Sequence, residues 1–159
     1  MERIKSFTID HTKLKAGVYV SRKDFVGNEI LTTFDIRLKK PNVDQVITPE
    51  SIHSMEHLAA TYLRNHNTYG EKTIYFGPMG CLTGVYWVVA GDYTSRDVLC
   101  VLRDLFEYIS TYTGEIPGAS PVECGNYTMM DLEQTKRDAQ EFLINTLQNI
   151  SEDQLEYPA

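Results

Sequence analysis

The sequence predicts an α+β fold in which helices pack on an antiparallel β-sheet. Alternating, β-branched and aromatic residues predict strands in four segments, residues 18–25, 29–39, 73–76 and 83–90. Apolar residues at helical spacing predict three helices, over residues 49–66, 94–113 and 131–150. The two kinds of element are mixed along the chain, and we find no internal repeat or linker. We therefore expect a single domain over residues 1–159.

The first two strands are expected to form a hairpin. Gly27-Asn28 is a turn signal between residues 18–25 and residues 29–39. Side chains of the second strand alternate between its two faces, so one face should carry Ile30, Thr32, Phe34, Ile36 and Leu38, and the other Leu31, Thr33, Asp35 and Arg37.

The first helix has a clear start signal. Thr48 can act as its N-cap, and Pro49 suits the first helical position, where no N–H is needed. Apolar residues then follow at helical spacing, namely Ile52, Met55, Ala59, Tyr62 and Leu63. We expect the turn-forming residues 67–70 to end this helix.

The next segments predict two strands joined by a glycine-rich turn and then a second helix. Thr94 or Ser95 is expected to cap that helix, which should stop near Gly114. Its apolar positions are Val98, Val101, Leu102, Leu105 and Ile109. Cys100 lies between two apolar residues of this helix, so we expect it in the core.

The last part of the chain is expected to be a loop followed by a helix. Residues 114–125 hold two prolines and three glycines, which predict irregular structure. Residues 131–150 carry the third helical pattern through Leu132, Ala139, Phe142, Leu143 and Leu147. The last nine residues are predicted to be a tail.

Composition narrows the class of protein. The 159 residues are 42% hydrophobic, which suffices for a core, and the net charge is −7 with no basic run longer than Lys39-Lys40. Nucleic-acid and anionic-membrane binding are therefore not expected, and a small-molecule partner is favoured. There is no signal-peptide pattern and no apolar run of about 18 residues, and the three cysteines fit reduced thiols, so we expect a cytoplasmic protein.

The segment from His53 to His57 predicts a metal site. Histidines four residues apart lie on one face of a helix, as two ligands of a transition metal must. Glu56 before the second histidine gives the His-x-x-Glu-His order of inverted zincins, although alone it fits a solvated helix charge. Cys124, in the glycine-containing loop, is the candidate third ligand; its alternative role is a small buried apolar residue.

Cys81 is a second candidate thiol. It lies in a turn between Gly80 and Gly84, where a thiol can be accessible, but a packing role at a strand start is an equal alternative. His11 and Arg37, near expected strand ends, can bind a substrate carboxylate or hydroxyl, yet by themselves they also fit ordinary surface residues.

Together these segments resemble the S-ribosylhomocysteine lyase (LuxS) family of autoinducer-2 synthesis. The resemblance covers nearly the whole chain and rests on residues 6–11, 34–37, 52–58, 77–84 and 124–126. It implies metal ligands at His53, His57 and Cys124, acid/base roles at Glu56 and Cys81, and substrate contacts at Ser6, His11 and Arg37. Two residues differ from many members of the family: Tyr75 replaces an acidic residue and Met130 a histidine.

The resemblance also implies a fold, a reaction and an assembly. The fold is an antiparallel sheet covered by helices, shared with inverted-zincin peptidases. One divalent metal per chain is expected, iron(II) with zinc or cobalt as substitutes. The reaction moves a carbonyl along the ribose and then eliminates homocysteine, giving 4,5-dihydroxypentane-2,3-dione, the autoinducer-2 precursor of quorum sensing. The expected assembly is a homodimer with its active sites at the interface.

Two other classes use the same residues. An inverted-zincin peptidase would activate water with the histidine pair and Glu56, but it usually takes a glutamate as third ligand. A zinc-stabilised binding module would need a fourth protein ligand to close the site, and Cys81 is the only evident choice.

Overall fold

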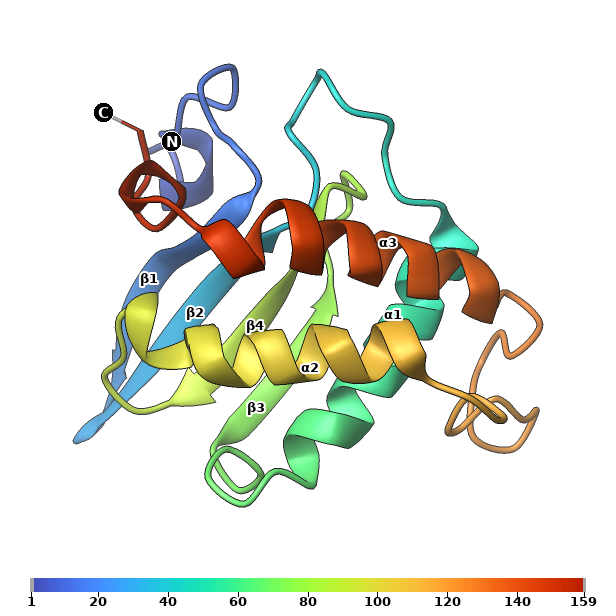
Figure 1. The fold of residues 1–159 in the computed structure, drawn as a ribbon. Coiled ribbons are helices and arrows are strands. Elements are labelled where there is room, and N and C mark those ends of the chain that lie inside the picture. The colour runs from blue at the N-terminus through green and yellow to red at the C-terminus, as the bar shows by residue number, and fades with distance from the viewer. Residues whose placement is uncertain (1, 159) are drawn as a thin grey trace.

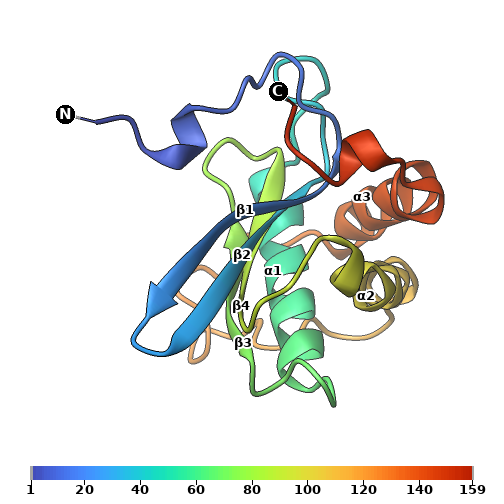
Figure 2. The ribbon, with the colours of Figure 1, turned by 90° about the vertical axis from the view of Figure 1, so that its left-hand side faces the viewer.

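The computed structural model describes residues 2–158 and confirms the α+β class. Four strands form one antiparallel sheet in the order β1-β2-β4-β3 (Figure 1), with bounds β1 Gly17–Val26, β2 Glu29–Arg37, β3 Thr73–Pro78 and β4 Gly84–Ala90. The helices are α1 Pro49–Arg64, α2 Leu99–Thr111 and α3 Leu132–Asn145. All three lie on the same side of the sheet (Figure 2), so no α-helix of the described residues covers its other face. Among the described residues, no helix has the length and apolar character needed to cross a bilayer.

The predicted hairpin is confirmed, with its turn at the expected residues. Val26 pairs with Glu29, which leaves Gly27 and Asn28 as a two-residue turn. Gly27 has a φ of 62°, a left-handed conformation that glycine adopts without strain. β2 then lies between β1 and β4, so it is a central strand of the sheet.

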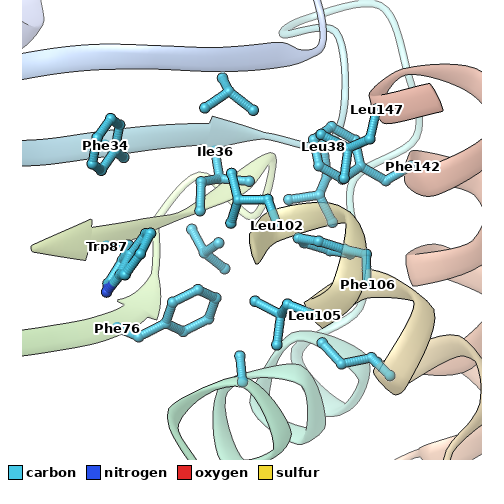
Figure 3. Close-up of a cluster of buried hydrophobic side chains, with 14 of the residues drawn as sticks. Phe34, Ile36, Leu38, Phe76, Trp87, Leu102, Leu105, Phe106, Phe142 and Leu147 are labelled. Atoms are coloured by element: carbon cyan, nitrogen blue, oxygen red, sulfur yellow. The ribbon is translucent and has the colours of Figure 1, made fainter. Parts of the chain in front are cut away.

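The core lies between the sheet and the helices (Figure 3). Phe34 and Ile36 point into it from the predicted face of β2, and Trp87 of β4 joins them. From the helix side, Phe106 of α2 and Phe142 of α3 meet edge to face with ring centroids 4.9 Å apart. Each such fully buried side chain contributes about 1.5–3 kcal/mol through the hydrophobic effect. This core holds the sheet and helices together as one body.

The predicted start of α1 is confirmed. Thr48 Oγ1 accepts a hydrogen bond from the Ser51 N–H at 3.2 Å, and Pro49 occupies the first helical position. The helix ends at Arg64, and Asn65 is its C-cap. The Thr48 cap fixes where the helix begins, and the histidine pair lies in its first three turns.

Three predictions about the second half of the chain are wrong. Cys100 is exposed rather than in the core, because it lies on the same stripe of α2 as Asp104 and Glu107, at i+4 and i+7. Neither Thr94 nor Ser95, the two predicted N-caps, caps α2 with its side chain. The Ser95 hydroxyl instead donates to the Leu155 carbonyl, and a short 3-10 turn, Arg96–Val98, precedes the helix.

The third wrong prediction concerns the end of the chain. α3 stops at Asn145, short of residue 150, and a 3-10 turn, Leu147–Asn149, follows it. The last nine residues were expected to be a tail, but 151–158 fold back against β1, through a second 3-10 turn and the buried side chain of Leu155. Tyr157 stacks on Tyr19 with ring centroids 4.9 Å apart. Burial of these apolar groups outweighs the local polarity of the segment.

Candidate metal centre and active site

The structure brings His53, His57 and Cys124 together. The two histidines lie in the first three turns of α1, and their ring centroids are 4.8 Å apart. Cys124 comes from the predicted loop between α2 and α3, some 70 residues downstream, with its Sγ 3.5 Å from His53 Nε2. One ligand atom from each residue lies within 4.8 Å of the others, and all three side chains are half-buried. This group is the candidate metal centre.

Two backbone carbonyls orient the imidazoles. His53 Nδ1 lies 2.8 Å from the Met129 carbonyl oxygen, and His57 Nδ1 lies 2.7 Å from that of Pro117. A carbonyl can only accept, so each Nδ1 carries the proton and each Nε2 keeps a lone pair for a ligand. A hydrogen bond of this kind is the usual support of a metal-binding histidine. Neither carbonyl can be predicted from the sequence, because every residue carries a backbone carbonyl.

The donor set fits a divalent metal ion. At tetrahedral angles, a metal–nitrogen bond of about 2.0–2.1 Å and a metal–sulfur bond of about 2.3 Å place the two ligand atoms about 3.5 Å apart. The observed distance between Cys124 Sγ and His53 Nε2 is also 3.5 Å. Two imidazoles and a thiolate suit zinc or iron(II). Cys81 is not part of the group, so the described residues do not supply the fourth ligand that a closed structural site would need.

The loop that carries Cys124 is tied to α1 at both ends. Near its start, Gly118 has a φ of +72°, and a Cβ built there would lie 3.2 Å from His57 Nδ1. Only glycine lets the backbone pass this close to the imidazole without strain. Near its end, the Ser54 hydroxyl accepts from the Asp131 N–H at 2.8 Å and contacts the Met130 sulfur at 3.6 Å. The prolines and glycines that predicted a loop therefore also shape the metal centre.

Glu56 precedes His57 on α1 and is half-buried. It forms no salt bridge within residues 2–158. A carboxylate that no cation neutralises remains available for proton transfer. The alternative role of a solvated helix charge is also compatible with a half-buried side chain.

Cys81 belongs to a second group, in the turn between β3 and β4. Its Sγ lies 3.0 Å from Thr83 Oγ1 and 3.7 Å from Arg37 Nη1. Burial alone would raise the pKa of this thiol, but hydrogen bonds from the Thr83 side chain and backbone and the charge of Arg37 together lower it. The thiol is exposed to solvent. An accessible thiol with a lowered pKa is a reactive group, which speaks against a mere packing role.

Arg37 is not the surface residue that its sequence position also allowed. Only 2% of it is exposed, and its Nε and Nη2 donate to both carboxylate oxygens of Asp35 at 3.1 and 2.6 Å. Burial would lower the pKa of Arg37, but the Asp35 carboxylate outweighs it and raises the pKa, so the guanidinium stays charged. Nη1 also donates to Thr83 Oγ1 at 2.7 Å.

The remaining predicted residues, Ser6 and His11, lie in the segment before β1. Ser6 is part of a short 3-10 turn, Lys5–Phe7, and is half-buried. His11 Nδ1 donates to the Ile9 carbonyl oxygen at 2.9 Å. Neither belongs to the metal group or to the group around Cys81 in this chain. The predicted site residues are therefore distributed over three places in the protein.

The sequence matches the family described as S-ribosylhomocysteinase (LuxS) over residues 4–153. The chain belongs to that family. Similar proteins include an S-ribosylhomocysteine lyase of Desulfotalea psychrophila, 52% identical over 159 residues and covering 100% of both chains. Proteins of the same name from Clostridium acetobutylicum and Porphyromonas gingivalis are 51% and 48% identical over 158 residues, with 99% of each chain covered. The LuxS resemblance inferred from the motifs is confirmed.

Proposed function

We propose that this chain is an S-ribosylhomocysteine lyase, a carbon–sulfur lyase that releases homocysteine and 4,5-dihydroxypentane-2,3-dione. The proposal rests on the full-length similarity to proteins of that name, which are 52% and 51% identical to this chain. The group of His53, His57 and Cys124, which fits a metal, supports it. The product dione would make the enzyme a source of autoinducer-2 in quorum sensing. Its small, polar substrate is consistent with the absence of long basic runs.

The proposed reaction is a series of proton transfers followed by elimination. A divalent metal, when bound, supplies a Lewis acid for a carbonyl oxygen of the ring-opened ribose. Cys81 and Glu56 would carry the protons that move the carbonyl from C1 to C2 and then to C3. Removal of the C4 proton then breaks the C5–S bond, and the electron pair leaves with the homocysteine sulfur. No oxidant or reductant is consumed in this sequence.

Cys81 is suited to this role by its surroundings. Its lowered pKa increases the fraction of thiolate at any given pH, and its exposure lets a substrate carbon approach. Cys81→Ala should retain the metal and lose activity, whereas Cys100→Ala, at an exposed position on α2, should leave activity near normal. Equal loss of metal in Cys81→Ala would place Cys81 among the ligands instead.

We further propose that Ser6, His11 and Arg37 bind the substrate and that the enzyme works as a homodimer. Two observations support a second copy. Within residues 2–158 the metal group and the Cys81 group share no interaction, which fits a site that a second copy completes. The sheet face without helices (Figure 2) also exposes Tyr75, with half-buried Val88 and Tyr86 near it. An exposed patch of aromatic and apolar side chains such as these three fits an interface between two copies.

The dimer proposal has a direct test. His57→Ala and Cys81→Ala each disable both sites of a homodimer. If each site combines the metal group of one chain with Cys81 of the other, a mixed dimer regains one intact site, and random exchange should restore about a quarter of wild-type activity. No restoration, with sedimentation showing that dimers exchange, would place both groups of each site in one chain.

The remaining features of the proposal concern metal, location and fold. We propose iron(II) as the native metal, with zinc or cobalt as substitutes, because two imidazoles and a thiolate suit each of these ions. The three cysteines are free in the structure, which fits a reducing cytoplasm. We also propose that residues 1–159 act as a single catalytic domain and that the fold is related to that of the inverted-zincin peptidases.

The lyase proposal is tested by thiol release. S-ribosylhomocysteine added to the metal-loaded enzyme should yield free homocysteine, read with a chromogenic thiol reagent, while peptides should stay intact. Glu56→Gln should abolish release yet still bind metal, because the amide keeps the shape but cannot carry a proton. In deuterated water the dione should gain deuterium at former ribose carbons. If no thiol appears while the metal site is full, the chain is not a lyase for this substrate.

A further inference from the structure

The end of the chain reaches the sheet beside the group that holds Cys81. The ring of Tyr157 lies parallel to that of Tyr19 on β1, with centroids 4.9 Å apart and planes at 14°. Its hydroxyl donates to Asp35 Oδ2 at 2.8 Å, and Ser21 also hydrogen-bonds to it. A residue 122 positions away in sequence thus contacts the central strand β2.

From Asp35 the contacts continue without a break to the thiol. The carboxylate is almost fully buried, and Arg37 donates two hydrogen bonds to it. The third guanidinium nitrogen, Nη1, points the other way, to Thr83 Oγ1 at 2.7 Å and Cys81 Sγ at 3.7 Å. Because a guanidinium is a rigid plane, the position of Asp35 determines where Nη1 lies relative to the sulfur.

We propose that Tyr157 is a positioning residue for the Cys81 thiolate, acting through the Asp35 carboxylate and the Arg37 guanidinium. A buried carboxylate needs several donors, and the Tyr157 hydroxyl is one that Arg37 does not supply. Without it, Asp35 can reorient or admit water, and Nη1 of Arg37 loses its fixed place beside the sulfur. The inference rests on the proposed catalytic role of Cys81 and assigns a function to the chain end.

The charged and titratable groups around Cys81 agree with this chain of contacts. The nearest cation is Arg37, Asp35 lies behind it, and Tyr86 of β4 stays neutral because burial and then the Asp35 charge raise its pKa. Burial, followed by the Asp35 charge, also raises the pKa of Tyr157. Tyr157 therefore remains a protonated donor throughout the neutral range, and Arg37 supplies the positive charge that favours a thiolate.

The test measures the thiol itself rather than the lyase reaction. Tyr157→Phe keeps the stack on Tyr19 and removes only the hydroxyl, while Tyr157→Ala removes both. Tyr108→Phe, on α2 and packed against Tyr62 and Tyr112, is the matched control. In each metal-loaded full-length protein, the rate at which iodoacetamide modifies the Cys81 peptide is followed against pH by mass spectrometry.

In Tyr157→Phe the titration midpoint of Cys81 should rise by about half a pH unit, which lowers the alkylation rate below the midpoint roughly threefold. In Tyr157→Ala the midpoint should rise further. Tyr108→Phe should match the wild type. In steady-state assays kcat should fall more than KM changes, because the thiolate acts in the reaction step. An unchanged Cys81 midpoint in folded Tyr157→Phe and Tyr157→Ala overturns the proposal. Since alkylation needs no substrate, this result is independent of whether the chain cleaves S-ribosylhomocysteine.

Discussion

Replacing Thr83 by valine should raise the pKa of the Cys81 thiol by about one unit. Thr83 Oγ1 lies 2.7 Å from Arg37 Nη1 and 3.0 Å from Cys81 Sγ, so its hydroxyl accepts from the guanidinium and donates to the thiolate. A hydrogen bond to a charged group contributes about 1.5–3 kcal/mol, and one pKa unit equals about 1.4 kcal/mol. Because solvent reaches the sulfur, the lower end of that range applies.

The pKa of Cys81 should rise because only its deprotonated form loses a hydrogen-bond donor. Valine has nearly the same shape as threonine but cannot donate to the thiolate, so the deprotonated form alone is destabilised. The alkylation rate of the Cys81 peptide, measured against pH, should fall about tenfold below its midpoint. Thr135→Val, at a buried position on α3, is the control of equal chemistry. A midpoint that does not move in Thr83→Val would refute the assignment of this hydroxyl as a donor.

Three further substitutions test the metal centre and the core. Cys124→Ala should lose most of the metal counted by elemental analysis after anaerobic purification; full retention would remove Cys124 from the ligand set. Gly118→Ala should weaken metal binding about tenfold in competition with a chelator, because a Cβ 3.2 Å from His57 Nδ1 would displace the Pro117 carbonyl that orients the ring. An unchanged metal affinity would argue against a role of this carbonyl in metal binding. Thr135→Val should raise the free energy of unfolding in urea by about 1 kcal/mol, since Thr135 Oγ1 is buried without a partner among the described residues; a loss would mean that the hydroxyl is bonded.

Local features of this protein were predictable from sequence because they depend on neighbours along the chain. The Thr48-Pro49 start of α1 and the Gly27-Asn28 turn follow from backbone geometry at single positions. The spacing of His53 and His57 places both imidazoles on one helix face whatever the rest of the fold. Cys124 could be proposed as a third ligand from its residue type and its glycine-containing loop, although no periodicity connects it to α1.

Other features were decided only by the tertiary structure. Cys100 lies next to two buried residues in sequence, yet its exposure depends on which side of α2 faces the sheet. The polar end of the chain carries no periodic pattern, but Tyr157 finds the ring of Tyr19 and the carboxylate of Asp35. Backbone carbonyls, such as that of Pro117 on His57, are common to all residues and so cannot be recognised from residue type. The contacts of Tyr157 and of the Pro117 carbonyl join segments distant in the chain, and only the packing of the whole fold brings such segments within bonding distance.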